Sequence, residues 1–232
     1  MNLIPHNYTV ASSKPWHRER FESMRESLSG HWEYAGSLEE LELAVKTRDP
    51  RYIFFLHWNW SVPRALWQKY ECVCFHMTDV PYGRGGSPLQ NLIVAGRRET
   101  MLTALRMVEE LDAGPVYAKR PMSLEGRAED IYDRAGALSW EMIRWIVEKQ
   151  PIPVPQEGEV TRFQRRKPEQ SVLPHEGSIE SLYDHIRMLD APTYPLAFVD
   201  HGQFRLEFSH AEIHGDEIHA RVVLRLRTRE PK

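Results

Sequence analysis

The feature that most constrains the fold is a short run of residues that is apolar on both faces. Tyr52 to Trp58 reads YIFFLHW and lacks the alternation of a strand with one face in water. Such a run is typical of a central strand in a parallel sheet that helices cover on both sides. The segments between Tyr8 and His76 alternate strand and helix patterns around it. We therefore predict an α/β fold with a parallel sheet.

Local signals predict where the elements lie. Ser37 and Glu40 form a capping-box signature before a helical pattern, and Ser87-Pro88 is an N-cap followed by proline at the first helical position. Gly30 and Gly96 end helices. The expected strands are 8–12, 31–34, 52–58, 72–76, 100–107 and 116–120, and the expected helices are 17–28, 38–49, 64–70, 89–96, 128–148 and 179–189.

The chain divides, on its composition, into a large and a small part. We expect a catalytic domain over 1–150, a proline-rich spacer over 151–160 (PIPVPQEGEV), and a small mixed or mostly β part over 161–232. The small part ends in a hairpin around Gly215-Asp216. One face of the hairpin carries arginines and the other carries Val222, Leu224 and Leu226. We expect a half-buried edge hairpin, or a surface for a homodimer.

Charge and cysteine usage exclude several classes of protein. Lys plus Arg is 30 and Asp plus Glu is 33, which gives a net charge of −3 and does not fit a chain that coats nucleic acid. No apolar run approaches the ~20 residues of a membrane span. The start of the chain lacks the pattern of a signal peptide. Cys72 and Cys74 are two residues apart, which favours no disulfide, so we expect a cytoplasmic protein.

The segment with the most chemistry is Cys74 to Pro88, CFHMTDVPYGRGGSP. Its glycine-rich end precedes a helix, as in anion-binding loops, but it has neither the Walker nor the dinucleotide spacing. On composition alone, a tight turn without a ligand is the favoured interpretation. His76 ends a buried strand, where parallel sheets open toward their ligands, and Asp112 lies in a turn before Gly114. Both residues could also be structural.

Two motifs in the same order resemble a known family. His76, Pro81, Arg84, Gly85 and Pro88 match N-x-H-x-S-x-L-P-x-x-R-G-x-x-P, and Leu111-Asp112-x-Gly114 follows as L-D-x-G, about 36 residues later. The chain thus resembles the formyltransferases that use 10-formyltetrahydrofolate, over roughly 52–147. The resemblance implies a Rossmann-like catalytic domain, shortened at its N-terminal half, with the folate as co-substrate.

The resemblance also implies roles for particular residues. His76 would act as a base or polarising donor, and Asp112 would orient it or relay the proton of an acceptor amine. The folate would lie along two loops, with two tryptophans that either stack on its ring or pack the sheet edge. The implied folate-binding residues are Trp58, Asn59, Trp60, Val62, Pro63, Met107, Val108 and Leu111, and the implied substrate-binding residues are Arg84, Gly85, Gly86, Arg165 and Arg166.

Cys74 departs from the family pattern. It occupies the catalytic position where the family has an asparagine that donates to the oxyanion, and a thiol is a weak donor. Losing one oxyanion donor typically costs ~10²–10³ in rate. Three explanations are open: Asn59 or a backbone amide donates instead, His76 donates, or the protein binds its ligands with little turnover.

The acceptor is expected to be a small molecule. The basic run Arg162, Arg165, Arg166 and Lys167 is short for a tRNA but suits a diphosphate, unless it is a solvated loop. This segment resembles the region that follows the catalytic domain in sugar N-formyltransferases, and the resemblance implies transfer to the amine of a nucleotide-linked amino sugar of a surface-glycan or pseudaminic-acid-like pathway. Alternatives are a methionyl-tRNA formyltransferase, a folate deformylase, and a weakly catalytic folate or nucleotide-sugar binder. No residues show the spacing of a metal site, so we predict no metal.

Overall fold

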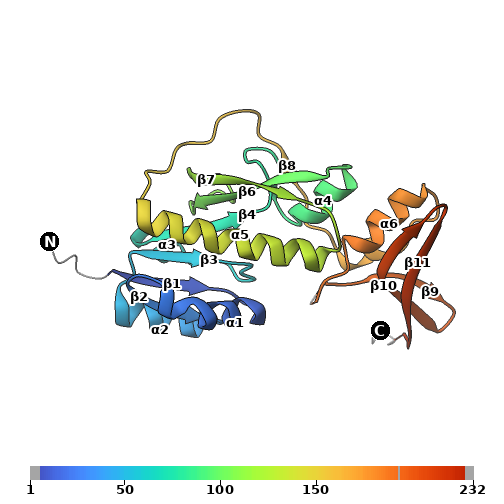
Figure 1. Cartoon of the computed structure of the whole chain (residues 1–232), viewed down its shortest axis with the longest axis horizontal. Coiled ribbons are helices and arrows are strands. Elements are labelled where there is room, and N and C mark those ends of the chain that lie inside the picture. The colour runs from blue at the N-terminus through green and yellow to red at the C-terminus, as the bar shows by residue number, and fades with distance from the viewer. Residues whose placement is uncertain (1–5, 193, 228–232) are drawn as a thin grey trace. The chain divides into compact units, whose positions relative to one another are not determined.

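The computed structural model describes residues 6–192 and 194–227 (Figure 1). The chain forms two compact units, each assembled from three stretches. The first unit contains 1–84, 101–121 and 135–162, and the second contains 85–100, 122–134 and 163–232. The expected division at 151–160 stays a prediction.

A six-stranded sheet forms the centre of the fold, in the order β2-β1-β3-β4-β6-β7. Its strands are β1 (Asn7–Ala11), β2 (His31–Ala35), β3 (Tyr52–Phe55), β4 (Glu71–His76), β6 (Glu99–Arg106) and β7 (Val116–Ser123). Strands β1 to β4 pair in parallel, and β6 pairs with β4 in the antiparallel direction. The predicted α/β fold with a mainly parallel sheet is confirmed.

The helices begin within two residues of their expected starts, whereas α1 ends at Met24 rather than at residue 28. The helices are α1 (Pro15–Met24), α2 (Leu38–Arg48), α3 (Arg64–Lys69), α4 (Pro88–Val94), α5 (Ala128–Lys149) and α6 (Ile179–Arg187), with 3₁₀ turns at Arg25–Ser27 and Pro168–Ser171. The Ser37 hydroxyl accepts a hydrogen bond from the Glu40 amide at 3.2 Å and caps α2. Pro15 and Pro88 open α1 and α4, where the missing N–H costs nothing.

Both faces of β3 are buried, as its apolar run predicts. Ile53 and Phe55 join a core cluster that includes Leu41 and Val45 of α2. On the other face, Phe54 stacks with Trp32. Each large apolar side chain removed from water contributes roughly 1.5–3 kcal/mol. The strand ends at Phe55 rather than at Trp58, because His57 adopts a left-handed backbone (φ 46°) that an extended strand does not accommodate.

A buried pair of histidines connects α1 with the end of β3. His17 Nε2 lies 2.8 Å from His57 Nδ1, and the two rings stack with their centroids 5.1 Å apart. Burial lowers the pKa of His17 to about 3 and that of His57 to about 4. Both rings are therefore neutral at physiological pH. One of the two facing nitrogens carries a hydrogen and donates it to the other, which accepts.

In the second unit, α6 and a three-stranded antiparallel sheet follow one another in the chain. The sheet has the order β11-β10-β9, with β9 (Ala197–His201), β10 (Phe204–His214) and β11 (Glu217–Leu226).

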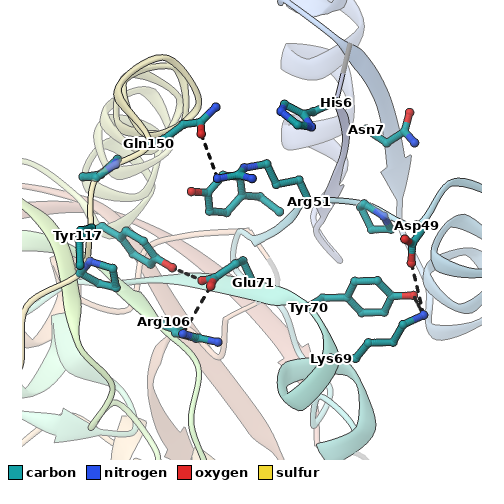
Figure 2. A pocket seen from close by; sticks show the side chains of 15 residues that line it. His6, Asn7, Asp49, Arg51, Lys69, Tyr70, Glu71, Arg106, Tyr117 and Gln150 are labelled. Atoms are coloured by element: carbon teal, nitrogen blue, oxygen red, sulfur yellow. Dashed lines mark hydrogen bonds and ion pairs between the residues drawn. The ribbon is translucent and has the colours of Figure 1, made fainter. Parts of the chain in front are cut away.

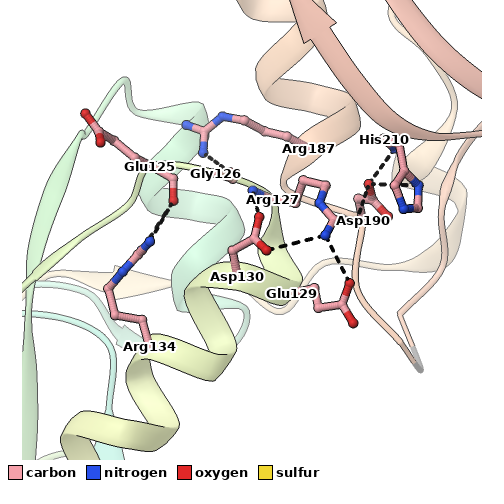
Figure 3. A network of polar contacts seen from close by, with 9 residues as sticks. All are labelled: Glu125, Gly126, Arg127, Glu129, Asp130, Arg134, Arg187, Asp190 and His210. Carbon is pink, nitrogen blue, oxygen red and sulfur yellow. Dashed lines mark hydrogen bonds and ion pairs between the residues drawn. The ribbon is translucent and has the colours of Figure 1, made fainter.

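Arg187 at the end of α6 is 1% exposed and donates to the carbonyls of Leu124 (2.7 Å) and Gly126 (2.8 Å). Figure 3 shows the contact between Arg187 and Gly126, together with Asp190, which accepts a hydrogen bond from the His210 amide at 2.6 Å.

The hairpin differs from the expectation of one half-buried face. Val222, Leu224 and Leu226 are 39%, 64% and 69% exposed. The buried residues of β10 are Ser209 and Ala211, beside the irregularity between Ser209 and Glu212. Alternation predicts the two faces of such a strand, but which face a neighbour covers depends on packing that a single strand's sequence does not encode.

Candidate active site

His76 is the last residue of β4 and is 7% exposed. Its Nε2 lies 2.8 Å from the carbonyl oxygen of Gly83. A carbonyl only accepts hydrogen bonds, so Nε2 must carry the hydrogen. The other ring nitrogen, Nδ1, is then the atom through which the neutral imidazole can accept a proton.

Asp112 lies beside that nitrogen. His76 Nδ1 and Asp112 Oδ2 are 3.6 Å apart, and both side chains are 9% exposed. The separation is longer than a hydrogen bond and short enough for charge pairing. Close packing explains the glycine of the L-D-x-G motif, because a Cβ at Gly114 would lie 1.7 Å from the carbonyl oxygen of Arg106. The two residues predicted as a catalytic pair are thus brought together.

Cys74 contacts the backbone of the neighbouring strand. Its Sγ donates to the Leu105 carbonyl oxygen at 3.7 Å, and the side chain packs against the core cluster that includes Leu41 and Val45 of α2. Burial raises the pKa of the Cys74 thiol well above its usual range, and burial also raises that of Cys72 to about 12. Both cysteines are free thiols. The thiol hydrogen of Cys74 is therefore directed at a carbonyl, which makes it a poor candidate for an oxyanion donor.

Arg84 is 8% exposed and holds protein groups in this structure. Its Nε and Nη2 donate to Gln156 Oε1 at 3.1 and 2.9 Å, and its Nη1 lies 3.3 Å from Glu110. Gln156 in turn donates to the carbonyl of Asp112 at 2.8 Å. These contacts support the Asp112 loop, and the predicted role in substrate binding stays a prediction.

The two glycines after Arg84 belong to the second unit, where a neighbouring segment approaches them closely. A Cβ at Gly85 would lie 2.4 Å from the Phe163 carbonyl oxygen, and one at Gly86 would lie 2.6 Å from Arg165 Cβ. The close approach of residues 163–165 therefore explains why both positions are glycine, and no bound anion is needed to explain them. The Arg166 amide donates to the Ser87 hydroxyl at 3.0 Å, so this hydroxyl does not cap α4 as predicted.

The two loops predicted to hold folate lie side by side. Arg64 and Glu109 form an ion pair at 3.2 Å between them. Of the eight predicted residues, Trp58, Val62 and Met107 pack against the core cluster. Asn59, Trp60, Pro63, Val108 and Leu111 are exposed. The exposed apolar members Trp60, Val108 and Leu111 present a surface that a flat heterocycle could cover, whereas the Trp58 indole N–H is buried and has no hydrogen-bond partner in the described chain.

Three groups around the pair were not found from the sequence. Gln156 and Thr161 lie in or beside the predicted spacer, and Gly83 contributes only its backbone. A backbone carbonyl leaves no trace in the identity of a residue. A glutamine among prolines gives no signal for a partner 44 residues away.

Comparison with known proteins identifies the family. A curated methionyl-tRNA formyltransferase from Bacillus mycoides is 32% identical over 163 residues, which are 66% of this chain and 51% of that protein. The solved structure of a methionyl-tRNA formyltransferase from Clostridium thermocellum is 41% identical, with a TM-score of 0.91, over 96% of this chain and 100% of that one. The chain belongs to the formyltransferase family. Its predicted family membership is confirmed.

Other comparisons extend to the C-terminal part and to the fold. Residues 168–225 match the family model for the C-terminal domain of methionyl-tRNA formyltransferase. The fold is shared with HypX from Aquifex aeolicus in complex with tetrahydrofolic acid (TM-score 0.73, 18% identity, 90% of this chain and 38% of that one). It is also shared with a sugar N-formyltransferase from Shewanella (TM-score 0.63, 13% identity, 85% and 93%). This formyltransferase-family chain spans about half the length of the curated relatives it matches.

The described residues lack two features. Residues 6–192 and 194–227 contain no group of three or more His, Cys, Asp or Glu side chains arranged to hold a metal ion. In the same part of the chain, no helix combines the length and the apolar character needed to cross a membrane.

Proposed function

We propose that the chain transfers a formyl group from 10-formyltetrahydrofolate to a primary amine. The observation that carries this proposal is the buried His76–Asp112 pair at the carboxyl end of β4. It supplies the proton-transfer groups that amide formation needs, in the place where parallel sheets bind their ligands. Membership of the formyltransferase family supports the same reaction.

The pair has a defined part in the reaction. As the acceptor nitrogen bonds to the formyl carbon, it becomes cationic and must lose a proton, while the departing nitrogen of the donor must gain one. His76 Nδ1 accepts the proton, because Nε2 is bound to the Gly83 carbonyl. The Asp112 carboxylate stabilises the imidazolium at 3.6 Å, and the proton then passes to the departing nitrogen.

Folate would supply the formyl group as an activated amide. The exposed apolar residues Trp60, Val108 and Leu111 would bury one face of its ring. A thermal-shift titration with 5-formyltetrahydrofolate tests this binding. Saturation at 100 times the dissociation constant adds ~2.7 kcal/mol, a rise of about 5–11 °C for a chain of this size. No shift at millimolar folate would contradict the proposal.

The comparisons favour methionyl-tRNA over an amino sugar as the acceptor, which reverses the order expected from the sequence. The methionyl-tRNA formyltransferase from Clostridium thermocellum is 41% identical over its whole chain, whereas the similarity to sugar N-formyltransferases is limited to the fold. We therefore propose the α-amine of methionyl-tRNA as the first acceptor to test.

One observation keeps the amino sugar as a second candidate. The hairpin arginines that could face RNA are paired with carboxylates: Arg225 with Glu207 at 2.8 Å, and Arg205 with Asp200 at 2.9 Å. Together with the net charge of −3, this leaves little unpaired positive charge on β9 to β11 for an RNA backbone.

A single assay separates these candidates. The protein and 10-formyltetrahydrofolate are incubated with methionyl-tRNA, with a nucleotide-linked amino sugar, or with no acceptor, and the products are identified by mass spectrometry. Formylmethionyl-tRNA supports the first candidate and a formylated sugar the second. Formate release that needs no amine would indicate a hydrolase and contradict both. Localisation in the cytoplasm and a homodimer stay predictions.

A further inference from the structure

We propose that residues 151–161, which we name the strap, position both members of the catalytic pair through Gln156 and Thr161. The proposal rests on the proposed function, because it assigns a role to the pair of His76 and Asp112. In the sequence the strap is a proline-rich spacer, and in the first unit it contacts the loops on which both members of the pair depend.

Gln156 holds the Asp112 side of the pair. Its Nε2 donates to the carbonyl oxygens of Asp112 and Gly114, both at 2.8 Å. Its Oε1 accepts from two nitrogens of Arg84, at 3.1 and 2.9 Å. Both amide hydrogens and the amide oxygen are thus engaged, which fixes the side chain and makes it a rigid bridge between Arg84 and the Asp112 loop.

The Asp112 loop needs such support. Asp112 has a left-handed backbone (φ 55°), which residues other than glycine seldom adopt without help from their surroundings. Gln156 binds the carbonyl of this residue and that of Gly114, two residues later, so it holds the strained turn at both ends. The direction of the Asp112 carboxylate follows from that turn.

Thr161 holds the His76 side. Its hydroxyl accepts from the Gly83 amide at 2.7 Å, and its backbone pairs with Pro81 (3.2 Å) and with Arg84 (3.0 Å). The Gly83 carbonyl is the group that binds His76 Nε2 and sets which ring nitrogen carries the hydrogen. Thr161 therefore fixes the loop that orients the imidazole.

The 3.6 Å separation between His76 Nδ1 and Asp112 Oδ2 is consequently set by one segment that touches both sides. Gln156 and Thr161 are positioning residues, since they act on the pair through backbone groups. A displacement of about 1 Å in such a constellation lowers a rate by as much as ~10².

The variant Gln156→Glu separates the two halves of the bridge. A carboxylate at this position still accepts from Arg84 but cannot donate to the carbonyls of Asp112 and Gly114. We expect kcat for formyl transfer to fall by ~10- to 100-fold while the KM for the acceptor changes less than twofold. We also expect faster amide hydrogen exchange in residues 107–114, measured by mass spectrometry, in the absence of any substrate.

Three further variants isolate the cause. Gln156→Met removes the donors without adding charge and should give the same loss of kcat. Gln150→Glu is the matched control, because Gln150 Oε1 also accepts from an arginine, Arg51 Nη2 at 2.9 Å, without touching the pair. It should match the wild type in both readouts. Thr161→Val should speed exchange in 81–84 and also lower kcat.

The outcomes are decisive even if formyl transfer itself is absent. Wild-type exchange in 107–114 for Gln156→Glu, or a kcat within twofold of the wild type, overturns the proposal. Faster exchange throughout the chain, including α2, would mean general unfolding and would also overturn it. Faster exchange confined to 107–114 in a protein without transferase activity would support the strap and reject the proposed function.

Discussion

The two edges of the parallel sheet in the first unit use charged residues in different ways. At the amino edge, a cavity of about 810 Å³ opens beside the first residues of β1, β3 and β4 (Figure 2). Glu71 accepts there from the Tyr117 hydroxyl and pairs with Arg106 at 3.4 Å, and Lys69 pairs with Asp49 at 3.3 Å. At the carboxyl edge lies the buried His76–Asp112 pair, roughly 16 Å away along β4.

The comparison shows that the volume of a cavity does not indicate whether its side chains are suited to catalysis. Both carboxylates at the amino edge have a cation or a phenol at contact distance, and Figure 2 shows these pairs across the cavity. At the carboxyl edge, the Asp112 carboxylate and the His76 imidazole lie 3.6 Å apart with both side chains 9% exposed, whereas the ion-paired side chains at the amino edge are 36–80% exposed. A pair of this kind is suited to proton transfer with a reacting group that binds beside it.

The largest expected effect comes from the carboxyl edge. His76→Asn should lower kcat for formyl transfer by ~10²–10⁴, because general acid–base catalysis contributes about that factor. Steady-state kinetics measure the change. Glu71→Gln, at the other end of the same strand, is the control and should change kcat less than twofold. Equal losses for both variants would contradict the contrast between the edges.

The carboxyl edge should also limit stability in acid. The pKa of His17 is lowered to about 3 in the folded chain, against about 6.5 when unfolded, so the unfolded state binds protons first. Stability is therefore full above pH 6.5 and falls as the pH decreases toward the folded value. Between pH 6.5 and pH 5 the loss is about 2 kcal/mol for one histidine.

Urea unfolding at pH 7 and pH 5 measures this loss. His17→Phe replaces the imidazole by an aromatic ring that does not titrate, so the variant should lose less stability than the wild type over the same interval. A variant with the full wild-type pH dependence would show that other groups cause the acid sensitivity.

The amino edge should affect stability without affecting catalysis. Tyr117→Phe removes the hydroxyl that donates to the partly exposed Glu71 carboxylate, and a hydrogen bond to a charged group contributes about 1.5–3 kcal/mol. We expect a loss near the lower value, because Arg106 still pairs with Glu71. Thermal unfolding and kcat are measured together. A tenfold fall in kcat would show that the amino edge takes part in the reaction.

The smallest effect is expected at Cys74. Its thiol donates to the Leu105 carbonyl, and a serine hydroxyl can do the same, so Cys74→Ser should leave kcat within twofold of the wild type. Cys74→Asn is the sharper test of the family difference. A rise in kcat of tenfold or more would show that the native site lacks an oxyanion donor, and an unchanged kcat would show that another group supplies it.

Much of the fold could be predicted from the sequence because its signals are local. The apolar run at Tyr52 predicts the central strand, and Ser37 and Pro88 predict where helices begin. The exposed apolar row on β11 could not be predicted, since burial depends on what packs against a face rather than on alternation within a strand.

The candidate site was predictable only in part. His76 and Asp112 could be found because motifs carry them, and the structure places them 3.6 Å apart. The role of Arg84 could not be read in the same way, because an arginine beside glycines suggests an anion, whereas its guanidinium is engaged by Gln156. That partner follows from the path of the chain, which brings together residues 72 positions apart.

The strap also carries a constraint on length. Proline-rich surface segments usually tolerate insertions and deletions, because they make few contacts. Here Gln156 and Thr161 are anchored to separate loops of one site. One residue inserted between them would displace an anchor by up to ~3.3–3.6 Å, more than a hydrogen bond can absorb. Between these two positions, natural variation should therefore change the identity of residues while preserving their number.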